Sequence, residues 1–230
     1  MTIVMRDDVI SSRSNLLSIP TPLYDPCEAC DFLSLKDKRL AKIIAEVGTC
    51  TIMSRRRMTP FAALMRSIVF QQLSGKAAGT IWGRVLDACP CKGSPKPEAV
   101  LSVSYETLRA AGLSNNKVLA VQDLTAKTLD GTVPGRRVLN RLPDEEIIER
   151  LTLVRGIGRW TVEMLLLFHL GRPDVFPVGD LGVRKGIAVT YGLDTVPEAD
   201  ELERYGDRWR PFRSVGSWYM WRALEIEVPD

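Results

Sequence analysis

The chain has a single histidine among 230 residues and no run of about 18 uncharged apolar residues, so nothing in it predicts a membrane span. Near the N-terminus, Arg6, Asp7 and Asp8 interrupt the apolar stretch that a secretory signal requires. We therefore expect a soluble, intracellular protein. His169 lies in the apolar run 164–170, which favours a core or interface residue over a catalyst.

Cysteine is also scarce. Five cysteines are an odd number, which is a poor inventory for disulfides in a chain of this length, and none follows Cys91. We therefore expect reduced thiols. The alternative is a zinc site formed by Cys27, Cys30, Cys89 and Cys91, but the single residue between the second pair is an unusual spacing and the gap between the pairs is long.

The net charge of +3 says little about partners, but the charge is uneven along the chain. Residues 51–110 hold nine Lys and Arg against three Asp and Glu, residues 151–190 hold five against three, and residues 191–230 hold five against nine. Two basic segments are what a protein that grips a phosphate backbone with two loops would show. On charge alone, a solvated basic surface without a ligand explains the counts equally well.

Apolar residues recur at helical spacing through most of the chain. Residues 1–30, which contain Pro20, Pro22 and Pro26, show no sustained period and predict an irregular N-terminal lead-in. Residues 31–230 predict a helical domain, with helices expected at 31–47, from 60, and at 75–88, 98–101, 105–110, 117–129 and from 143. No segment alternates with a period of two, so we expect an all-α fold.

The most informative stretch runs from Leu151 to Met164, where a helix end, a turn with two glycines and a new apolar helix follow one another. Gly156 and Gly158 allow the backbone to turn tightly and approach a ligand, and the free amides that begin the next helix form an anion site. A phosphate oxygen suits such a nest without any charged side chain. For a bare Gly-x-Gly between helices, however, an ordinary packing corner is the commoner explanation.

With its neighbours, this turn resembles the helix-hairpin-helix element of the base-excision DNA glycosylases. The match is to the 3-methyladenine, or alkylbase, branch, through Gly-Ile-Gly-Arg-Trp-Thr at 156–161, Gly-Arg-Pro-Asp-Val-Phe-Pro at 171–177 and Asp180 beyond them. The resemblance runs from about Pro60 to Arg222. It implies two helical subdomains flanking a cleft, with the hairpin, at roughly 144–170, in the second.

The resemblance also implies how the hairpin would hold DNA. The backbone of Gly156, Ile157 and Gly158 would bind a phosphate, and the carbonyls of Thr152, Val154 and Gly156 would hold a monovalent cation, sodium or potassium, that touches it. We expect no required cofactor. The four-cysteine iron–sulfur loop that some relatives carry is missing, because no cysteine lies in the later part of the chain.

Asp180 lies in a turn that leads into a helix, where an aspartate commonly acts as an N-cap. In the resembled family the matching aspartate serves the chemistry, and the two roles can coexist. Cleavage of an N-glycosidic bond builds positive charge on the sugar, which a carboxylate stabilises while it orients or deprotonates the attacking water. An alkylated purine already carries positive charge and leaves without an enzymatic acid, so one carboxylate suffices.

Four of the five tryptophans, Trp160, Trp209, Trp218 and Trp221, lie within about sixty residues, and such rings usually belong to a core. By the motif match, Trp160 and Trp221 correspond to rings that the family stacks on an extruded base, and we place Trp218 in the same pocket. A cationic base on an indole face gains roughly 0.5–2 kcal/mol. Superfamily members that also nick the strand carry a Schiff-base lysine at position 160, so the tryptophan there predicts no lyase activity.

The loop that joins the two early helices matches the family's plug, which fills the gap left by a flipped base. We map the plug to Leu73, with Gln72 and Ser74 beside it, and expect Lys76 to contact DNA. A capped helix junction with Leu73 in the core explains the pattern equally well. Further basic or pattern-matching positions, without an assigned role, are Arg55, Arg56, Arg57, Arg213 and Ser214.

The sequence therefore predicts a monofunctional DNA glycosylase, a hydrolase that flips alkylated purines of the 3-methyladenine and 7-methylguanine type and excises them in base excision repair. Its partner would be damaged double-stranded DNA, bound by a monomer without regard to sequence and with a steep salt dependence. It would be located with the genomic DNA, in the nucleus of a eukaryote or in the cytoplasm and nucleoid of a bacterium. The alternatives are a non-catalytic helix-hairpin-helix DNA-binding module and a glycosylase for deaminated or oxidised bases.

Overall fold

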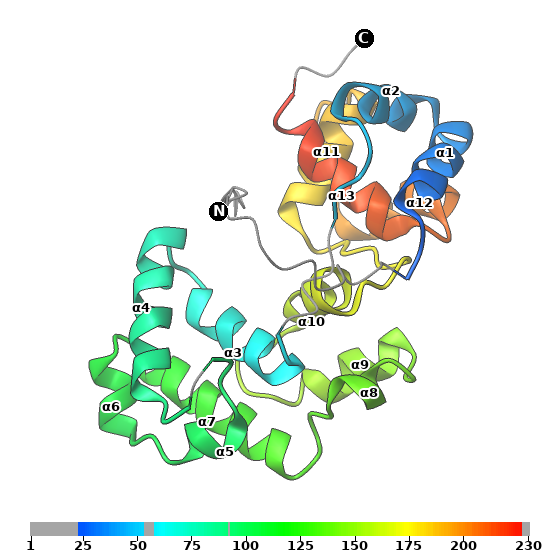
Figure 1. The fold of residues 1–230 in the computed structure, drawn as a ribbon. Helices are drawn as coiled ribbons and strands as arrows, with labels where there is room; N and C mark the ends of the chain where they lie inside the picture. The colour runs from blue at the N-terminus through cyan, green and yellow to red at the C-terminus, as the bar shows by residue number, and fades with distance from the viewer. Residues whose placement is uncertain (1–22, 53–57, 92, 227–230) are drawn as a thin grey trace, which may run out of the picture. The chain divides into compact units, whose positions relative to one another are not determined.

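The computed structural model describes residues 23–52, 58–91 and 93–226 (Figure 1). Across these ranges every regular element is a helix and no strand occurs, so the predicted all-α fold is confirmed. None of the helices in the described part of the chain is long and apolar enough to span a membrane. Arg55, Arg56 and Arg57 lie outside the described residues.

The chain divides into two compact units, one drawn from both of its ends and one from its middle. The described residues of the first unit are 23–52 and 171–226. Its elements are α1 (Pro26–Lys36), α2 (Lys38–Val47), α11 (Leu181–Tyr191), α12 (Glu203–Gly206) and α13 (Arg213–Ala223), with 3-10 turns at Ala199–Glu201 and Asp207–Trp209.

Helices α11 and α13 pack side by side in this first unit. They approach closely because Gly186 places no side chain between them, and a Cβ built there would lie 2.0 Å from the carbonyl oxygen of Met220. Around this pair the largest fully buried side chains include Leu33, Leu40, Ile43, Trp209 and Tyr219. The core of the unit therefore holds in register the two helices that begin after Asp180 and Phe212.

The beginning of the first unit differs from the sequence prediction in two ways. Helix α1 starts at Pro26, inside the stretch expected to be irregular. The side chain of Asp25 caps this helix by accepting a hydrogen bond from the amide of Cys27, and proline suits the first helical position. The helix expected at 31–47 is two helices, because Asp37 leaves the helical conformation and its carboxylate caps α2 at Arg39 and Leu40. Residues 1–22 lie outside the described residues.

The second unit comprises the described residues between 58 and 170. Its elements are α3 (Pro60–Phe70), α4 (Gly75–Ala88), α5 (Pro97–Leu101), α6 (Tyr105–Ala110), α7 (Asn115–Leu129), α8 (Arg136–Leu139), α9 (Asp144–Leu151) and α10 (Arg159–Leu165), and α10 continues into a π-helical turn at Leu166–Leu170. Most of these helices begin within two residues of the predicted positions, because local capping signals set their starts. Thr59, Ser74, Ser104 and Ser114 each accept a hydrogen bond from the amide three residues on.

Helices α3 and α7 form the centre of the second unit. Leu64, Met65 and Ile68 of α3 and Leu124 of α7 are fully buried. This packing places the C-terminal end of α3 and the loop after it next to the turn between α9 and α10, where Gln71 contacts Gly156. The two segments that sequence patterns single out as DNA contacts, the loop 71–74 and the hairpin turn, thus lie together in one unit.

Candidate functional site

Asp180 is the N-cap residue of α11, as its position in the sequence indicates. Its Oδ1 atom accepts a hydrogen bond from the amide of Val183 at 2.8 Å and another from the indole Nε1 of Trp221 at 2.9 Å. Asp180 is half-buried. The cap and the tryptophan fix the orientation of one carboxylate from two directions.

The space around this pair excludes a side chain at Gly182. A Cβ built there would lie 2.8 Å from Cδ1 of Trp221, closer than real contacts allow, and 3.0 Å from Oδ1 of Asp180, which is a tight contact. Trp221 itself is half-buried on the last turns of α13. Glycine at position 182 is therefore what lets the indole reach across to the first turn of α11.

The segment that leads to Asp180 is fastened to the start of α13. The carboxylate of Asp174 receives two hydrogen bonds from the guanidinium group of Arg213, Nε to Oδ1 at 2.7 Å and Nη2 to Oδ2 at 3.0 Å. It also accepts from the Arg213 amide at 3.4 Å and from Arg210 at 3.1 Å. Such a bidentate pair fixes geometry as well as charge. The acidic residue of the 171–177 motif thus has a defined partner, and Arg213, which had no role from sequence, gains one.

Ser214 adds a second set of contacts to the same segment. Its hydroxyl donates to the carbonyl of Arg172 at 2.7 Å and accepts from the amide of Val175 at 2.9 Å, while its own amide donates to the carbonyl of Pro173 at 3.0 Å. Ser214 is fully buried, so these hydrogen bonds are shielded from water. Asp180 and Trp221 are in this way positioned by one connected set of contacts in the first unit.

The hairpin turn between α9 and α10 has the backbone that its glycines predict. Gly156 has φ +75°, in the left-handed region that favours glycine, and Gly158 is the N-cap of α10. Both glycines are exposed. A turn of this kind that leads into the N-terminus of a helix is an arrangement that suits an anion.

Ile157, between the two glycines, is predicted to contact DNA through its backbone, and that contact stays a prediction. Its side chain is 4 % exposed and its amide donates to the carbonyl of Val154 at 3.1 Å. Ile157 therefore shapes the turn from inside, and its side chain does not face a ligand.

The turn is braced from α7 by Asp123, a residue that sequence patterns do not single out. Its Oδ2 atom accepts from the amide of Arg155 at 2.7 Å, and its Oδ1 atom pairs with Lys127 at 2.5 Å. Burial raises the pKa of Asp123, but the hydrogen bond from Arg155 and the contact with Lys127 outweigh it and leave the pKa below its ordinary value. Asp123 is thus a carboxylate at neutral pH, bonded to the hairpin backbone.

The loop after α3 presents Gln72 more than Leu73. Gln72 is exposed and has φ +58°, the one positive φ of a non-glycine residue in the described ranges, while Leu73 is half-buried. Ser74 accepts the Ala77 amide at 3.4 Å as the cap of α4, and Lys76 is exposed. The loop is therefore a capped helix junction, in which Gln72 has a strained backbone conformation and an exposed side chain.

The tryptophans predicted to line a base pocket differ in exposure. Trp160 is 38 % exposed in the first turn of α10, next to the hairpin, and Trp221 is half-buried. Trp218 is 9 % exposed and packs edge-on against the ring of Tyr219, 4.9 Å between centroids. Trp218 therefore packs within the first unit, and its place in a base pocket stays a prediction.

The remaining residues that the sequence singled out are the five cysteines and His169. All five cysteines are free thiols, and no group of three or more His, Cys, Asp or Glu side chains suited to a metal ion occurs in the described part of the chain. His169 is half-buried in the π-helical turn, where its carbonyl accepts a hydrogen bond from Arg136.

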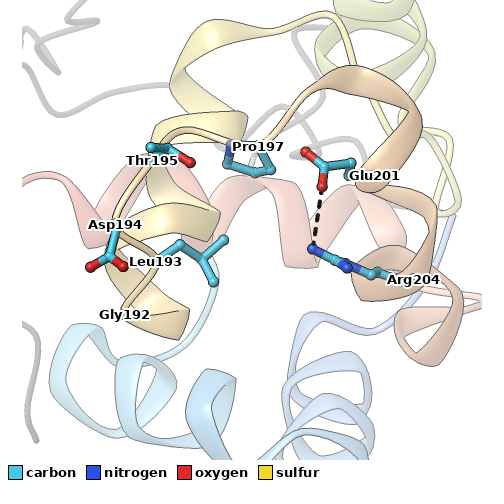
Figure 2. A pocket seen from close by; sticks show the side chains of 7 residues that line it. All are labelled: Gly192, Leu193, Asp194, Thr195, Pro197, Glu201 and Arg204. Carbon is cyan, nitrogen blue, oxygen red and sulfur yellow. Dashed lines mark ion pairs between the residues drawn. The ribbon is translucent and has the colours of Figure 1, made fainter.

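Figure 2 shows a solvent-open cavity of about 270 Å³ in the first unit, lined by Gly192, Leu193, Asp194, Thr195, Pro197, Glu201 and Arg204. Two of its residues, Glu201 and Arg204, form an ion pair at 3.7 Å. The cavity lies past the C-terminal end of α11, whereas Asp180 lies at the other end of that helix, about 16 Å away at 1.5 Å per residue. No residue from the predicted site lines it.

Comparison with known proteins gives this geometry a context. Residues 65–211 match the family described as HhH-GPD superfamily base excision DNA repair protein. The chain is 35 % identical over 189 residues to DNA-3-methyladenine glycosylase 1 of Schizosaccharomyces pombe, covering 82 % of each chain.

Solved structures agree with the sequence comparison. The 3-methyladenine DNA glycosylase of S. pombe (Mag1), solved in complex with abasic DNA, superposes with a TM-score of 0.77 at 33 % identity, covering 88 % of this chain and 99 % of that one. A DNA-3-methyladenine glycosidase from Bacillus halodurans gives the same TM-score at 34 % identity, covering 88 % and 91 %. The predicted fold and glycosylase family are confirmed, and the chain belongs to the HhH-GPD superfamily of base excision DNA repair proteins.

Proposed function

We propose that this chain is a hydrolytic DNA glycosylase that excises alkylated purines from duplex DNA, with Asp180 as its catalytic carboxylate. The observation that carries the proposal is the hydrogen bond from Trp221 to Asp180. It joins an indole ring to a half-buried aspartate at the start of α11. The relatives named DNA-3-methyladenine glycosylase support the substrate class.

The chemistry needs one well-placed negative charge. As the base departs, positive charge develops on the deoxyribose, and a fixed carboxylate stabilises it without having to reorganise. Asp180 also orients the water that attacks the sugar. An alkylated purine leaves as a neutral base, so no enzymatic acid is required, and the part-buried His169 has no step to perform.

Two indole rings, one from each unit, supply selectivity in this proposal. Trp221 uses its Nε1 atom to contact Asp180, which fixes the plane of the ring, and Trp160 presents an exposed ring beside the hairpin. A cationic purine against an indole face gains roughly 0.5–2 kcal/mol, and a neutral purine gains less. Contact with either ring would thereby favour damaged bases. The predicted pocket and cleft stay predictions.

The hairpin anchors the DNA backbone. The exposed turn at Gly156 and Gly158 offers main-chain amides to a phosphate, and the exposed ammonium of Lys76 adds an electrostatic contact. Such contacts position the duplex without reading its sequence.

A monovalent cation at the hairpin would be held by the carbonyls of Thr152, Val154 and Gly156. Val154 and Gly156 each already accept one hydrogen bond, from Ile157 and Gln71, and a carbonyl oxygen has a second lone pair. The residues therefore fit a weakly held sodium or potassium ion, which would supply positive charge next to a phosphate. No other cofactor enters the proposal.

Gln72 is the plug in this proposal, with Leu73 behind it. The left-handed backbone at Gln72 is a strain that proteins keep where a side chain must be aimed, and it turns this amide outward while Leu73 stays half-buried. An inserted side chain offsets part of the unstacking cost of a few kcal/mol. This assignment differs by one residue from the sequence prediction, which centred the plug on Leu73.

The protein would act as a monomer on damaged double-stranded DNA, in the nucleus or nucleoid where the genome lies. Trp160, in place of a Schiff-base lysine, supports hydrolysis without strand cleavage.

A panel of duplex oligonucleotides tests the proposal. Each duplex would carry one lesion: 3-methyladenine, 7-methylguanine, a deaminated purine or 8-oxoguanine. We expect release of the methylated bases, with the strand intact until alkali is added. Release of only deaminated or oxidised bases would establish the second alternative function, and binding without release of any base would establish a non-catalytic module.

A further inference from the structure

Gln71 joins the loop that carries the plug to the hairpin that would hold the phosphate. Its side-chain Nε2 donates a hydrogen bond to the carbonyl oxygen of Gly156 at 2.9 Å, across 85 residues of sequence. The orientation of the amide is fixed by chemistry, because a carbonyl can only accept and the Gln71 nitrogen must therefore face it. The contact is direct and links the C-terminal end of α3 to the hairpin turn.

The main chain at Gln71 is itself held in place. Lys117 on α7 points its ammonium group at the end of α3, where Nζ donates to the carbonyls of Val69 at 2.8 Å and Gln71 at 2.7 Å. Burial holds the pKa of Lys117 below its ordinary value, so water does not compete freely for these bonds. Gln71 thus has a backbone fixed from α7 and a side chain fixed on the hairpin.

The next residue along the chain is the one with strained geometry. Gln72 follows immediately with φ +58° and an exposed side chain. A left-handed conformation in a non-glycine residue persists only when its surroundings impose it. The fixed residue before Gln72 and the Ser74 cap after it supply that constraint.

The hairpin side of the link is equally well defined. Asp123 accepts the amide of Arg155, and the left-handed Gly156 lies against α7, where an added Cβ would be 3.4 Å from the Cβ of Ala120. The Gly156 carbonyl therefore has little freedom to follow Gln71.

We propose that Gln71 is a positioning residue that couples the phosphate-binding hairpin to the plug at Gln72. The proposal rests on the function proposed above and adds a residue to it. When the hairpin binds a phosphate, Gln71 sets the register of Gln72 relative to that phosphate, so that the plug enters the stack at the nucleotide being extruded. Gln71 itself contacts neither the base nor the reacting sugar.

The solvent exposure of the Gln71–Gly156 hydrogen bond determines which measured properties change when the bond is removed. The Gln71–Gly156 hydrogen bond is exposed in the free protein, so water replaces it easily and it adds little to folding stability. DNA bound to the hairpin would cover it, and the same hydrogen bond is stronger where water is excluded. Removing the donor should therefore leave the melting temperature unchanged and reduce base flipping and excision.

The test combines Gln71→Met, which keeps the length of the side chain without a donor, with Gln71→Ala and with Gln72→Ala. Gln122→Met is the matched control, because Gln122 is an exposed glutamine on α7 of the same unit. Single-turnover excision of 7-methylguanine, the fluorescence of a 2-aminopurine next to the lesion, affinity for a duplex with an abasic-site analogue, and the melting temperature are measured for each variant.

We expect Gln71→Met and Gln71→Ala to slow excision about 10- to 100-fold and to lower the 2-aminopurine signal, because a small misplacement of a positioning element costs that much. The melting temperature should match wild type, and affinity for the abasic duplex should fall much less than the excision rate. Every property of Gln122→Met should match wild type. In the Gln72→Ala background, Gln71→Met should slow excision by less than about twofold more, because the two residues act as one unit.

Independent losses that multiply in the double variant would overturn the coupling, as would wild-type excision by both Gln71 variants. A fall in abasic-duplex affinity as large as the fall in excision would also overturn it, because it would assign Gln71 to the anchor alone. Failure of the wild-type protein to release any base is a separate outcome, which refutes the proposed function and the coupling together.

Discussion

The indole nitrogen of Trp221 donates a hydrogen bond to Oδ1 of Asp180 at 2.9 Å, and the same oxygen accepts the amide of Val183. An aspartate that served only as a helix cap would need the hydrogen bond from Val183 and would not need the one from Trp221. The tryptophan ties the orientation of the carboxylate to α13, whose start is fastened to the segment that delivers Asp180. The cap and the proposed catalytic role therefore use the same geometry.

Replacing Trp221 by phenylalanine should separate the hydrogen bond from the ring. Phenylalanine keeps an aromatic face but cannot donate to Asp180, and a hydrogen bond to a charged group is worth about 1.5–3 kcal/mol. We expect single-turnover excision to fall about 10-fold or more in Trp221→Phe, and further in Trp221→Ala, which also loses the ring. Equal rates for wild type and Trp221→Phe would show that the hydrogen bond does not orient the carboxylate.

Gly182→Ala should impair excision by steric displacement. The new methyl group would lie 2.8 Å from Cδ1 of Trp221 and 3.0 Å from Oδ1 of Asp180, so the pair must move apart. The control is Gly83→Ala in α4, where an added Cβ meets nothing within 4 Å.

Helix propensity alone would stabilise the protein by about 0.5–1 kcal/mol in Gly83→Ala, which lies in the middle of α4, and by less in Gly182→Ala, which lies in the first turn of α11. We expect that gain only for Gly83→Ala, with unchanged excision, when thermal melts and excision rates are compared. A stabilised and fully active Gly182→Ala protein would contradict the packing described around Asp180.

Asp174→Asn should loosen the segment that leads to Asp180. The change removes the charge that Arg213 and Arg210 share while keeping the size of the side chain, and bonds of this kind are worth about 1.5–3 kcal/mol each when one partner is ionised. We expect a lower free energy of unfolding and slower excision, measured by urea denaturation and single-turnover kinetics.

Asp207→Asn is the matched control for Asp174→Asn, because Asp207 also pairs with Arg210 but lies at an exposed site away from the segment. A similar loss of excision in the two variants would mean that the Asp174–Arg213 contact does not position the site.

The cysteines should react with alkylating agents in an order set by burial. Burial raises the pKa of Cys50 to about 12, so only about one molecule in 10⁴ carries its thiolate at pH 8, and the side chain is 3 % exposed. Cys27 is exposed. Native-state labelling with iodoacetamide at pH 8, read by peptide mass spectrometry, should modify Cys27 and leave Cys50 unmodified. Equal labelling of the two would contradict the described core of the first unit.

The features that could be predicted from the sequence are those that nearby residues determine. Helix starts follow capping residues such as Thr59 and Ser74, and the glycines of the hairpin require the turn that the structure shows. Asp180 is recognisable as a cap from its position alone. These signals lie within a few residues of the feature that they specify.

The contacts that fix the site could not be predicted in this way, because their partners are distant in sequence. Gln71 and Gly156 are 85 residues apart and Arg213 and Asp174 are 39 apart, and only tertiary packing brings each pair together. Tertiary packing also decides the exposure of Trp218 and Trp221, which lie three residues apart on one helix. Packing buries Trp218 and leaves Trp221 half-buried, a difference that the pattern of aromatic residues does not contain.

The most direct test of the central claim is Asp180→Asn, compared with Asp194→Asn as an exposed carboxylate of the same unit. The asparagine oxygen can still accept from Val183 and Trp221, so the variant removes charge and keeps the cap. We predict that Asp180→Asn releases no methylated purine above background while it binds abasic-analogue DNA as wild type does, and that Asp194→Asn behaves as wild type in both assays. Release of methylated purines by Asp180→Asn at the wild-type rate would contradict the account.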